Sequence, residues 1–334
     1  NTTNRYNVSI GSFAGQRAIG TNSVNIGHNA GYYATGSFNT FLGSLAGKGG
    51  TTSAPYSSGQ NNTAVGYAAL DAFTTAGNNT ALGYTALSGV TTGGNNTAIG
   101  SHAGNSLTTG TENVYLGYLA GYNATGSESH GIAIGSHAGY QNRMASAVYV
   151  GRYAGFAGSG HIGVGNIAIG HQVLFTNLST DETGCKWNIA IGRSAMSNQS
   201  IGAAHSNVAI GYYALNNIES GSRNVVIGGQ QGGGDGGAGE YLKNGDDNVF
   251  VGAKAGQGID SGNIHSSRNV FIGSIAGASQ NGANYNVGVG YKSLIHTRGD
   301  YSVAVGYEAG DHATGSYNTF VGANAGQGGT TSAP

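Results

Sequence analysis

The sequence is dominated by a nine-residue pattern with a glycine at its fifth position, which recurs along the whole chain. One copy, at residues 207–215, reads NVAIGYYAL. Eighteen copies align on this glycine, and successive glycines lie 16 to 24 residues apart. A short period over a whole chain is typical of a solenoid, in which each repeat forms one coil. The sequence therefore predicts an all-β fold: a parallel β-solenoid or β-roll of about 18 coils, with one glycine-centred repeat per coil.

Composition supports an ordered chain without the usual nucleic-acid or membrane signatures. Charged residues make up 8% of the 334 residues, the net charge is −1, and there are only two prolines. Disordered chains are usually richer in charge or proline, and a nucleic-acid-binding chain needs a basic surface. No run of about 18 apolar residues occurs, as a membrane-spanning helix would need. We therefore expect no nucleic-acid partner, and no membrane insertion in this segment.

The residues before the central glycine alternate in a way that predicts a short strand. The second position is β-branched in all eighteen copies, and the fourth is Ile, Val or Leu. These two positions share one face of a strand, and we expect that face to point into the coil. The third position is usually Ala and in six copies Phe or Tyr. We expect it to point outward against a second layer, which a neighbouring copy of the chain would supply.

Three further positions predict how coils stack. The first position is Asn in fourteen of eighteen copies, so stacked coils should align these side chains in a hydrogen-bonded ladder. The central glycine either has positive φ or lies where a side chain would meet the next coil. Ala follows three residues later in fifteen copies, which predicts a tight interior.

A longer period indicates a segment of a larger fibre. Residues 34–55 and 313–334 agree at 17 of 22 positions, at an offset of 279. We therefore expect residues 1–334 to form a single continuous β-solenoid taken from a longer repeating chain. Three wider spacings between glycines predict lateral insertions, at loops 48–61, 175–187 and 229–247. Such loops are the best candidates for recognising a specific partner.

Candidate sites for chemistry are few. No Ser/His/Asp arrangement, carboxylate pair or phosphate-binding loop stands out, so we expect no enzyme, no catalytic residue and no cofactor. The ten histidines show no ligand spacing along the sequence, so we expect surface or packing histidines and no metal site. The lone Cys185 allows no intrachain disulfide. Candidate glycosylation acceptors are Asn61, Asn78, Asn95 and Asn123.

The copies NVAIG at 207–211, NIAIG at 188–192 and SVAVG at 302–306, each followed by x-x-Ala, resemble the head repeats of YadA-type trimeric autotransporter adhesins. Similar repeats occur in phage tail fibres and other fibrous surface proteins. The resemblance covers essentially the whole chain. It implies a left-handed parallel β-roll, three chains around a common axis, and adhesion to host or surface ligands. The coils here are longer than that family's usual repeat.

These features predict a structural or adhesive extracellular fibre segment, at a cell surface, that self-associates and displays a surface for attachment. The expected partners are copies of the chain, as a homotrimer and end to end, together with glycans or a host surface ligand. A bacteriophage tail fibre, and so a virion location, is the first alternative. A carbohydrate- or ice-binding solenoid is the second. The ice-binding reading is weakened by the expectation that the second-position threonines, at 40, 63, 80, 97 and 319, point inward.

Overall fold

The computed structural model describes residues 6–50, 56–123, 126–141, 145–157, 163–175, 185–197, 204–229, 236–258, 266–279 and 282–328. Contacts between residues divide the chain into two compact units, residues 1–158 and 159–334. Each unit is described by itself below. Whether the chain is one continuous solenoid stays a prediction.

Every glycine-centred repeat contributes one three-residue strand, just before its glycine. In the first unit the strands are β1 (Val8–Ile10), β2 (Val24–Ile26), β3 (Thr40–Leu42), β4 (Thr63–Val65), β5 (Thr80–Leu82), β6 (Thr97–Ile99), β7 (Val114–Leu116), β8 (Ile132–Ile134) and β9 (Val148–Val150). In the second unit they are β10 (Ile167–Ile169), β11 (Ile189–Ile191), β12 (Val208–Ile210), β13 (Val225–Ile227), β14 (Val249–Val251), β15 (Val270–Ile272), β16 (Val287–Val289), β17 (Val303–Val305) and β18 (Thr319–Val321).

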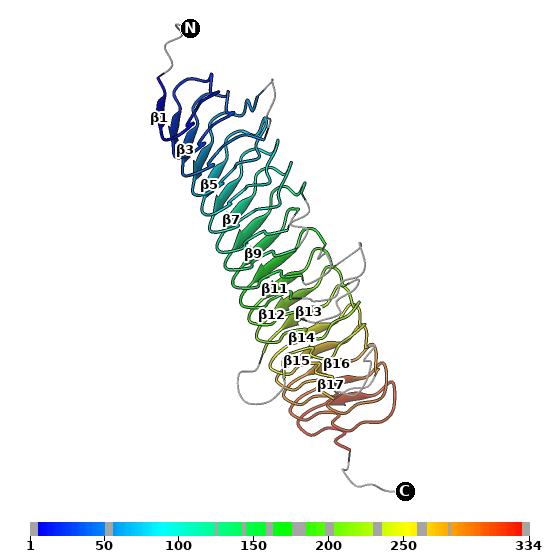
Figure 1. Cartoon of the computed structure of the whole chain (residues 1–334). Coiled ribbons are helices and arrows are strands. Elements are labelled where there is room, and N and C mark those ends of the chain that lie inside the picture. The colour runs from blue at the N-terminus through cyan, green and yellow to red at the C-terminus, as the bar shows by residue number, and fades with distance from the viewer. Residues whose placement is uncertain are drawn as a thin grey trace. The chain divides into compact units, whose positions relative to one another are not determined.

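Within each unit, consecutive strands pair in parallel and in register, residue for residue. In the first unit Thr80 pairs with Thr97, and Leu82 with Ile99. In the second, Val249 pairs with Val270. Figure 1 shows the strands of each unit stacked in chain order, with one loop of chain between successive strands. No helix occurs in the described ranges. The predicted all-β parallel solenoid, with one repeat per coil, is confirmed.

The strand faces are the reverse of the expectation. From β2 to β17 the middle residue of each strand is buried, and neither flanking residue is buried in any of them. Ala81 is fully buried, for example, whereas the side chain of Leu82 is exposed. The physical reason is space: a coil closed by only about 17 residues has a narrow interior, so it takes Ala from the strand rather than two branched side chains. The branched residues therefore lie on the outside of the sheet.

The interior is filled by a size exchange between two positions of the same coil. These are the middle strand residue and the fourth residue after the central glycine. In coils where the first is Ala, the second is often Leu, as in Ala81 with Leu87. Where the first is aromatic, the second is Gly, and a Cβ there would meet the ring: one on Gly256 would lie 2.6 Å from Cγ of Phe250. Close packing explains the exchange, because each coil must fill about the same volume.

The asparagine ladder forms as predicted. Asn96 is fully buried. Its Nδ2 donates to Oδ1 of Asn79 at 3.1 Å and to the carbonyl of Gly110 at 2.9 Å. Its Oδ1 accepts from the backbone N and the Nδ2 of Asn113, both at 3.0 Å. Each such amide therefore joins its own coil to both neighbours and leaves no buried polar atom unpaired.

The central glycine satisfies both reasons predicted for it. All eighteen have φ between +121° and +144°. At Gly83, with φ of +143°, an added Cβ would also lie 2.6 Å from the carbonyl carbon of Gly100 in the next coil. Neither condition tolerates a side chain. The predicted tight interior is confirmed too, because the Ala three residues later is fully buried in coil after coil, as at Ala86 and Ala103.

The three predicted insertions lie only partly within the described residues. Residues 51–55, 176–184 and 230–235 are outside them. Around the first gap, Ser57 forms a parallel bridge with Ala34 and Tyr56 stacks on Tyr33 at 5.6 Å. After the third gap, Ala238 and Leu242 are buried. The chain thus rejoins the coil before both of these insertions end.

Candidate functional site

The most extensive unusual surface in each unit is the outward face of its parallel sheet. It is formed by the first and third residue of every strand and is called the outer sheet face here. In the first unit, Leu82, Ile99 and Leu116 follow one another in successive coils and are 44%, 36% and 41% exposed. Ile272 and Val305 are similarly exposed in the second unit. Contiguous exposed apolar side chains of this kind mark interaction surfaces.

The outer sheet face carries no charge, because no strand residue is Asp, Glu, Lys or Arg. Its third-residue column contains only Ile, Val and Leu, whereas its first-residue column includes five threonines. The expectation that these threonines point inward is wrong. Thr40, Thr63 and Thr80 are exposed, and so is Thr319, because they share the outward face with the branched residues. The objection raised against an ice-binding surface therefore no longer holds.

Tyrosine rings border this face, one residue after the central glycine. Tyr67 stacks on Tyr84 with ring centroids 5.3 Å apart, and Tyr291 on Tyr307 at 5.5 Å. Each is roughly half exposed. Ring stacking along the coils covers part of their edge, and one face of each row stays open to solvent. The expected cover over the coil edge is therefore present, while a contact with another chain stays a prediction.

Two of the histidines predicted to pack do so beside these rings. The ring of His102 lies 5.1 Å from Tyr84. The ring of His137 lies 5.3 Å from Tyr118 and 4.8 Å from Tyr153. Desolvation lowers the pKa of His137, and the charge of Arg152 lowers it further.

No family model matches the chain, and no curated protein matches it. The likeness to YadA-type head repeats thus remains a resemblance, and the site must be argued from its own geometry.

A second candidate site is an aromatic-lined hollow on the first coils of the first unit. Its volume is about 310 Å³. Its walls are Phe13, His28, Asn29, Tyr32, Tyr33 and Lys48. The rings of Tyr32 and Tyr33 meet edge to face at 4.5 Å. Flat rings beside an amide and an ammonium group are the features that bind saccharides, since rings cover apolar sugar faces and polar groups bond hydroxyls.

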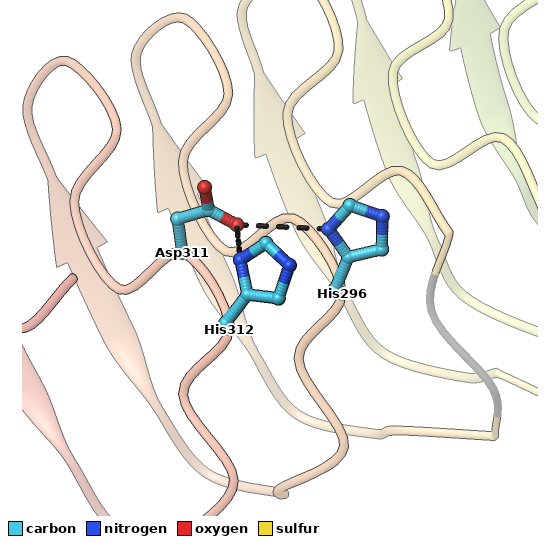
Figure 2. Close-up of side chains that lie close together, drawn as sticks. All are labelled: His296, Asp311 and His312. Atoms are coloured by element: carbon cyan, nitrogen blue, oxygen red, sulfur yellow. Dashed lines mark ion pairs between the residues drawn. The ribbon is translucent and has the colours of Figure 1, made fainter. Parts of the chain in front are cut away.

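A third candidate is a cluster of two histidines and a carboxylate in the second unit (Figure 2). Oδ1 of Asp311 lies 2.7 Å from Nδ1 of His312 and 3.6 Å from Nδ1 of His296. The two imidazole rings stack with centroids 4.4 Å apart. Linear spacing did not show this pair. The signal was present, however: each histidine is the sixth residue after its central glycine, Gly290 or Gly306, so stacked coils place one over the other.

Three of the candidate glycosylation acceptors occupy one repeated position. Asn61, Asn78 and Asn95 are exposed, each directly before a ladder asparagine, with φ of +57° to +59°. Asn tolerates this left-handed conformation better than most residues, which gives a purely structural reason for its recurrence there. Asn123 is exposed as well, and its Oδ1 accepts a hydrogen bond from Oγ of Ser106. Residues 124 and 125 of its acceptor motif lie outside the described residues. Glycosylation stays a prediction.

Cys185 is buried, and burial raises the pKa of its thiol to about 12. A protonated, inaccessible thiol is a poor nucleophile. Within the described ranges there is also no helix long and apolar enough to cross a membrane.

Proposed function

We propose that this chain is a structural segment of an extracellular fibre, which self-associates through its outer sheet face and displays the remaining surface for attachment. The observation that carries the proposal is the uninterrupted column of exposed Ile, Val and Leu at the third strand position. A surface of this kind is expensive to leave in water, at about 25 cal/mol per Å² of apolar area.

A second copy of the same chain is the occupant that fits this face best. The face repeats once per strand, so another copy matches it rung for rung at a spacing of about 4.8 Å. It carries no charge that an identical neighbour would repel. The chain's net charge of −1 also sets up no strong repulsion between copies. A homotrimer, with three such faces around one axis, is the arrangement that the resemblance to YadA-type repeats implies.

The available area is of the right order. Nine strands about 4.8 Å apart and three residues long present a face of roughly 40 by 10 Å, or about 400 Å², in each unit. The two units together offer about 800 Å², which is what one partner contributes to a typical stable interface. A chain this size therefore has enough apolar face to hold copies together.

The test is a variant with Leu82, Ile99 and Leu116 all replaced by Lys, compared with the unchanged chain by sedimentation velocity and light scattering. We expect the unchanged chain to be oligomeric and the variant to be monomeric at the same concentration, with the same circular dichroism spectrum. The outward position of these side chains makes loss of the fold itself unexpected, because Lys replaces no buried group there.

The matched control places three lysines at the same spacing elsewhere in the same coils. Thr75, Thr92 and Thr109 are exposed, and successive members lie 17 residues apart, as Leu82, Ile99 and Leu116 do. Their replacement by Lys should leave the oligomer intact. A monomeric unchanged chain at micromolar concentration, or an oligomer that survives the first set of lysines, would refute self-association through this face.

A bacteriophage tail fibre uses the same structural property and remains the first alternative. Saccharide binding is a second candidate function, favoured by the aromatic-lined hollow. It predicts binding in a glycan array, followed by isothermal titration with the sugar selected there. Replacement of Tyr33 by Ala should abolish this binding, and replacement of the surface Tyr307 by Ala should not. Binding that is absent, or equal in both variants, would eliminate this candidate.

A further inference from the structure

The His296, Asp311 and His312 side chains converge from two adjacent coils of the second unit (Figure 2). His296 follows β16, and Asp311 and His312 follow β17. We propose that these three residues form a binding site for a divalent first-row transition metal such as Zn²⁺, which would join the two coils. The site is independent of the outer sheet face and of any adhesive role.

The distances suit a shared metal ion. One ligand atom from each residue can be chosen so that all three lie within 4.8 Å of one another. Zinc binds imidazole nitrogen and carboxylate oxygen at about 2.0–2.2 Å, so two ligands of a tetrahedral site lie roughly 3.3 Å apart. The separations of 2.7 Å and 3.6 Å between Asp311 Oδ1 and the two Nδ1 atoms bracket that value. A small adjustment of side-chain torsions therefore completes the geometry.

The close pair in this cluster is not a hydrogen bond. Oδ1 of Asp311 and Nδ1 of His312 are 2.7 Å apart, yet both are shielded from solvent without a hydrogen-bond partner among the described residues. The two atoms approach each other without the direction that an N–H donor would need. Two polar atoms that lack water and do not satisfy each other carry a desolvation cost, which a cation bound by both would remove.

The donor set selects the class of metal. Two imidazoles and one carboxylate suit Zn²⁺, Cu²⁺ or Ni²⁺, whereas Ca²⁺ and Mg²⁺ prefer ligands that are all oxygen. The Asp311 side chain is only 13% exposed, which holds the carboxylate in place, while the His296 side chain is 45% exposed. This open side gives an ion a route in and leaves room for water as a further ligand.

The repeat pattern alone does not produce this cluster. At the offset of 279, the positions equivalent to His296, Asp311 and His312 hold Arg17, Tyr32 and Tyr33. None of these three is a nitrogen–carboxylate ligand set. The same place in the coil therefore holds a metal-binding combination in one super-repeat and an aromatic one in the other.

The experiment is isothermal titration of the full chain with Zn²⁺, together with Co²⁺ absorption to report inner-sphere coordination. We expect one ion per chain at this site. In separate variants, Asp311→Asn and His312→Asn should each weaken binding by about tenfold or more, as even the loss of an outer-sphere partner does. Asn suits position 312, where φ is +59°. Zn²⁺ should also raise the melting temperature of the unchanged chain, and of neither variant.

His130→Asn is the matched control, because His130 lies 3.3 Å from Glu112 as an exposed histidine–carboxylate pair without a second histidine. It should bind Zn²⁺ as the unchanged chain does. The site is refuted if the unchanged chain binds no stoichiometric ion, or if Asp311→Asn binds as tightly with an unchanged circular dichroism spectrum. Should His312→Asn fail to fold, His296→Asn at the more exposed position tests the same ligand set.

Discussion

Exchanging the sizes of two interior residues in one coil tests how the solenoid is packed. In the coil of β14, Phe250 is buried and Gly256 lies against its ring. In the coil of β12, Ala209 and Leu215 occupy the same two positions. The double variant Phe250→Ala with Gly256→Leu therefore writes the second solution into the first coil. If the two positions exchange volume, each single change should be harmful and the pair should be tolerated.

The expected magnitudes follow from the contacts. Phe250→Ala empties a buried ring-sized volume and should cost about 3–5 kcal/mol. Gly256→Leu alone forces a side chain against Phe250 and should cost about 1–3 kcal/mol through overpacking. The left-handed backbone is no obstacle, because Leu215 has φ of +53° where Gly256 has +61°. The pair should cost only about 1–2 kcal/mol, mainly for the lost stacking with Phe271 at 5.3 Å.

Hydrogen exchange by mass spectrometry on the peptide spanning residues 248–258 measures this locally. A local readout is preferable because repeat proteins need not unfold in one cooperative step. Exchange in that peptide should accelerate by roughly a thousandfold in Phe250→Ala, since about 1.4 kcal/mol corresponds to tenfold. In the double variant it should return to within about tenfold of the unchanged chain. A double variant as fast as the sum of the two single changes would refute the volume exchange.

Three further changes test the ladder, the glycine and the thiol. Asn96→Ala removes four hydrogen bonds and should cost about 4 kcal/mol at about 1 kcal/mol each, whereas Asn95→Gly next to it should change stability by less than about 1 kcal/mol; urea unfolding compares them. Gly83→Ala should fail to accumulate as folded protein, because its Cβ meets the Gly100 carbonyl; size-exclusion chromatography and circular dichroism check this. Cys185 should not react with a thiol reagent at pH 9, where about 0.1% would be thiolate, until the chain unfolds in urea; rapid modification of the folded chain would contradict its burial.

Much of the fold could be predicted because every coil repeats the same local signals. The glycine, the alanine three residues later and the ladder asparagine each have one physical reason that acts identically in each coil. Asn96 bonds to Asn79 below and Asn113 above because the period of the sequence becomes a stacking distance in space. A repeat thus converts a weak single-coil pattern into a strong prediction.

The direction of the strand faces could not be obtained from alternation alone. Period two determines which residues share a face, but not which face is inside. In Val208-Ala209-Ile210 both faces are apolar, and the larger side chains suggested the wrong one. The deciding signal was the inverse size relation between the middle strand residue and the residue four after the glycine, seen in Phe41 with Gly47 and Ala64 with Leu70. Residues that exchange volume must share one interior.

The histidine cluster shows a similar limit. His296 and His312 are 16 residues apart, which is not a ligand spacing on a helix or a strand. It becomes one only when each residue is numbered from its own central glycine. In a solenoid, proximity is set by equal position in successive coils. The same numbering brings together the stacked rings of Tyr285, Tyr301 and Tyr317, which lie one per coil at 4.7 Å and 5.0 Å.

The corrected face assignment strengthens the argument for self-association. Had the branched residues pointed inward, the outer face would be mostly Ala, which needs no cover. They point outward, and the two outward columns differ: the first-residue column admits Thr, while the third-residue column holds only Ile, Val and Leu in all eighteen coils. A column facing only water would accept Thr, Ser or Lys at some coils, because little stability depends on such positions. The stricter column should therefore lie at the centre of the contact between chains, with the threonines of the other column at its edge. The exposed acceptors Asn61, Asn78 and Asn95 precede Thr63, Thr80 and Thr97 on that same edge, so glycans there would lie beside the contact rather than within it.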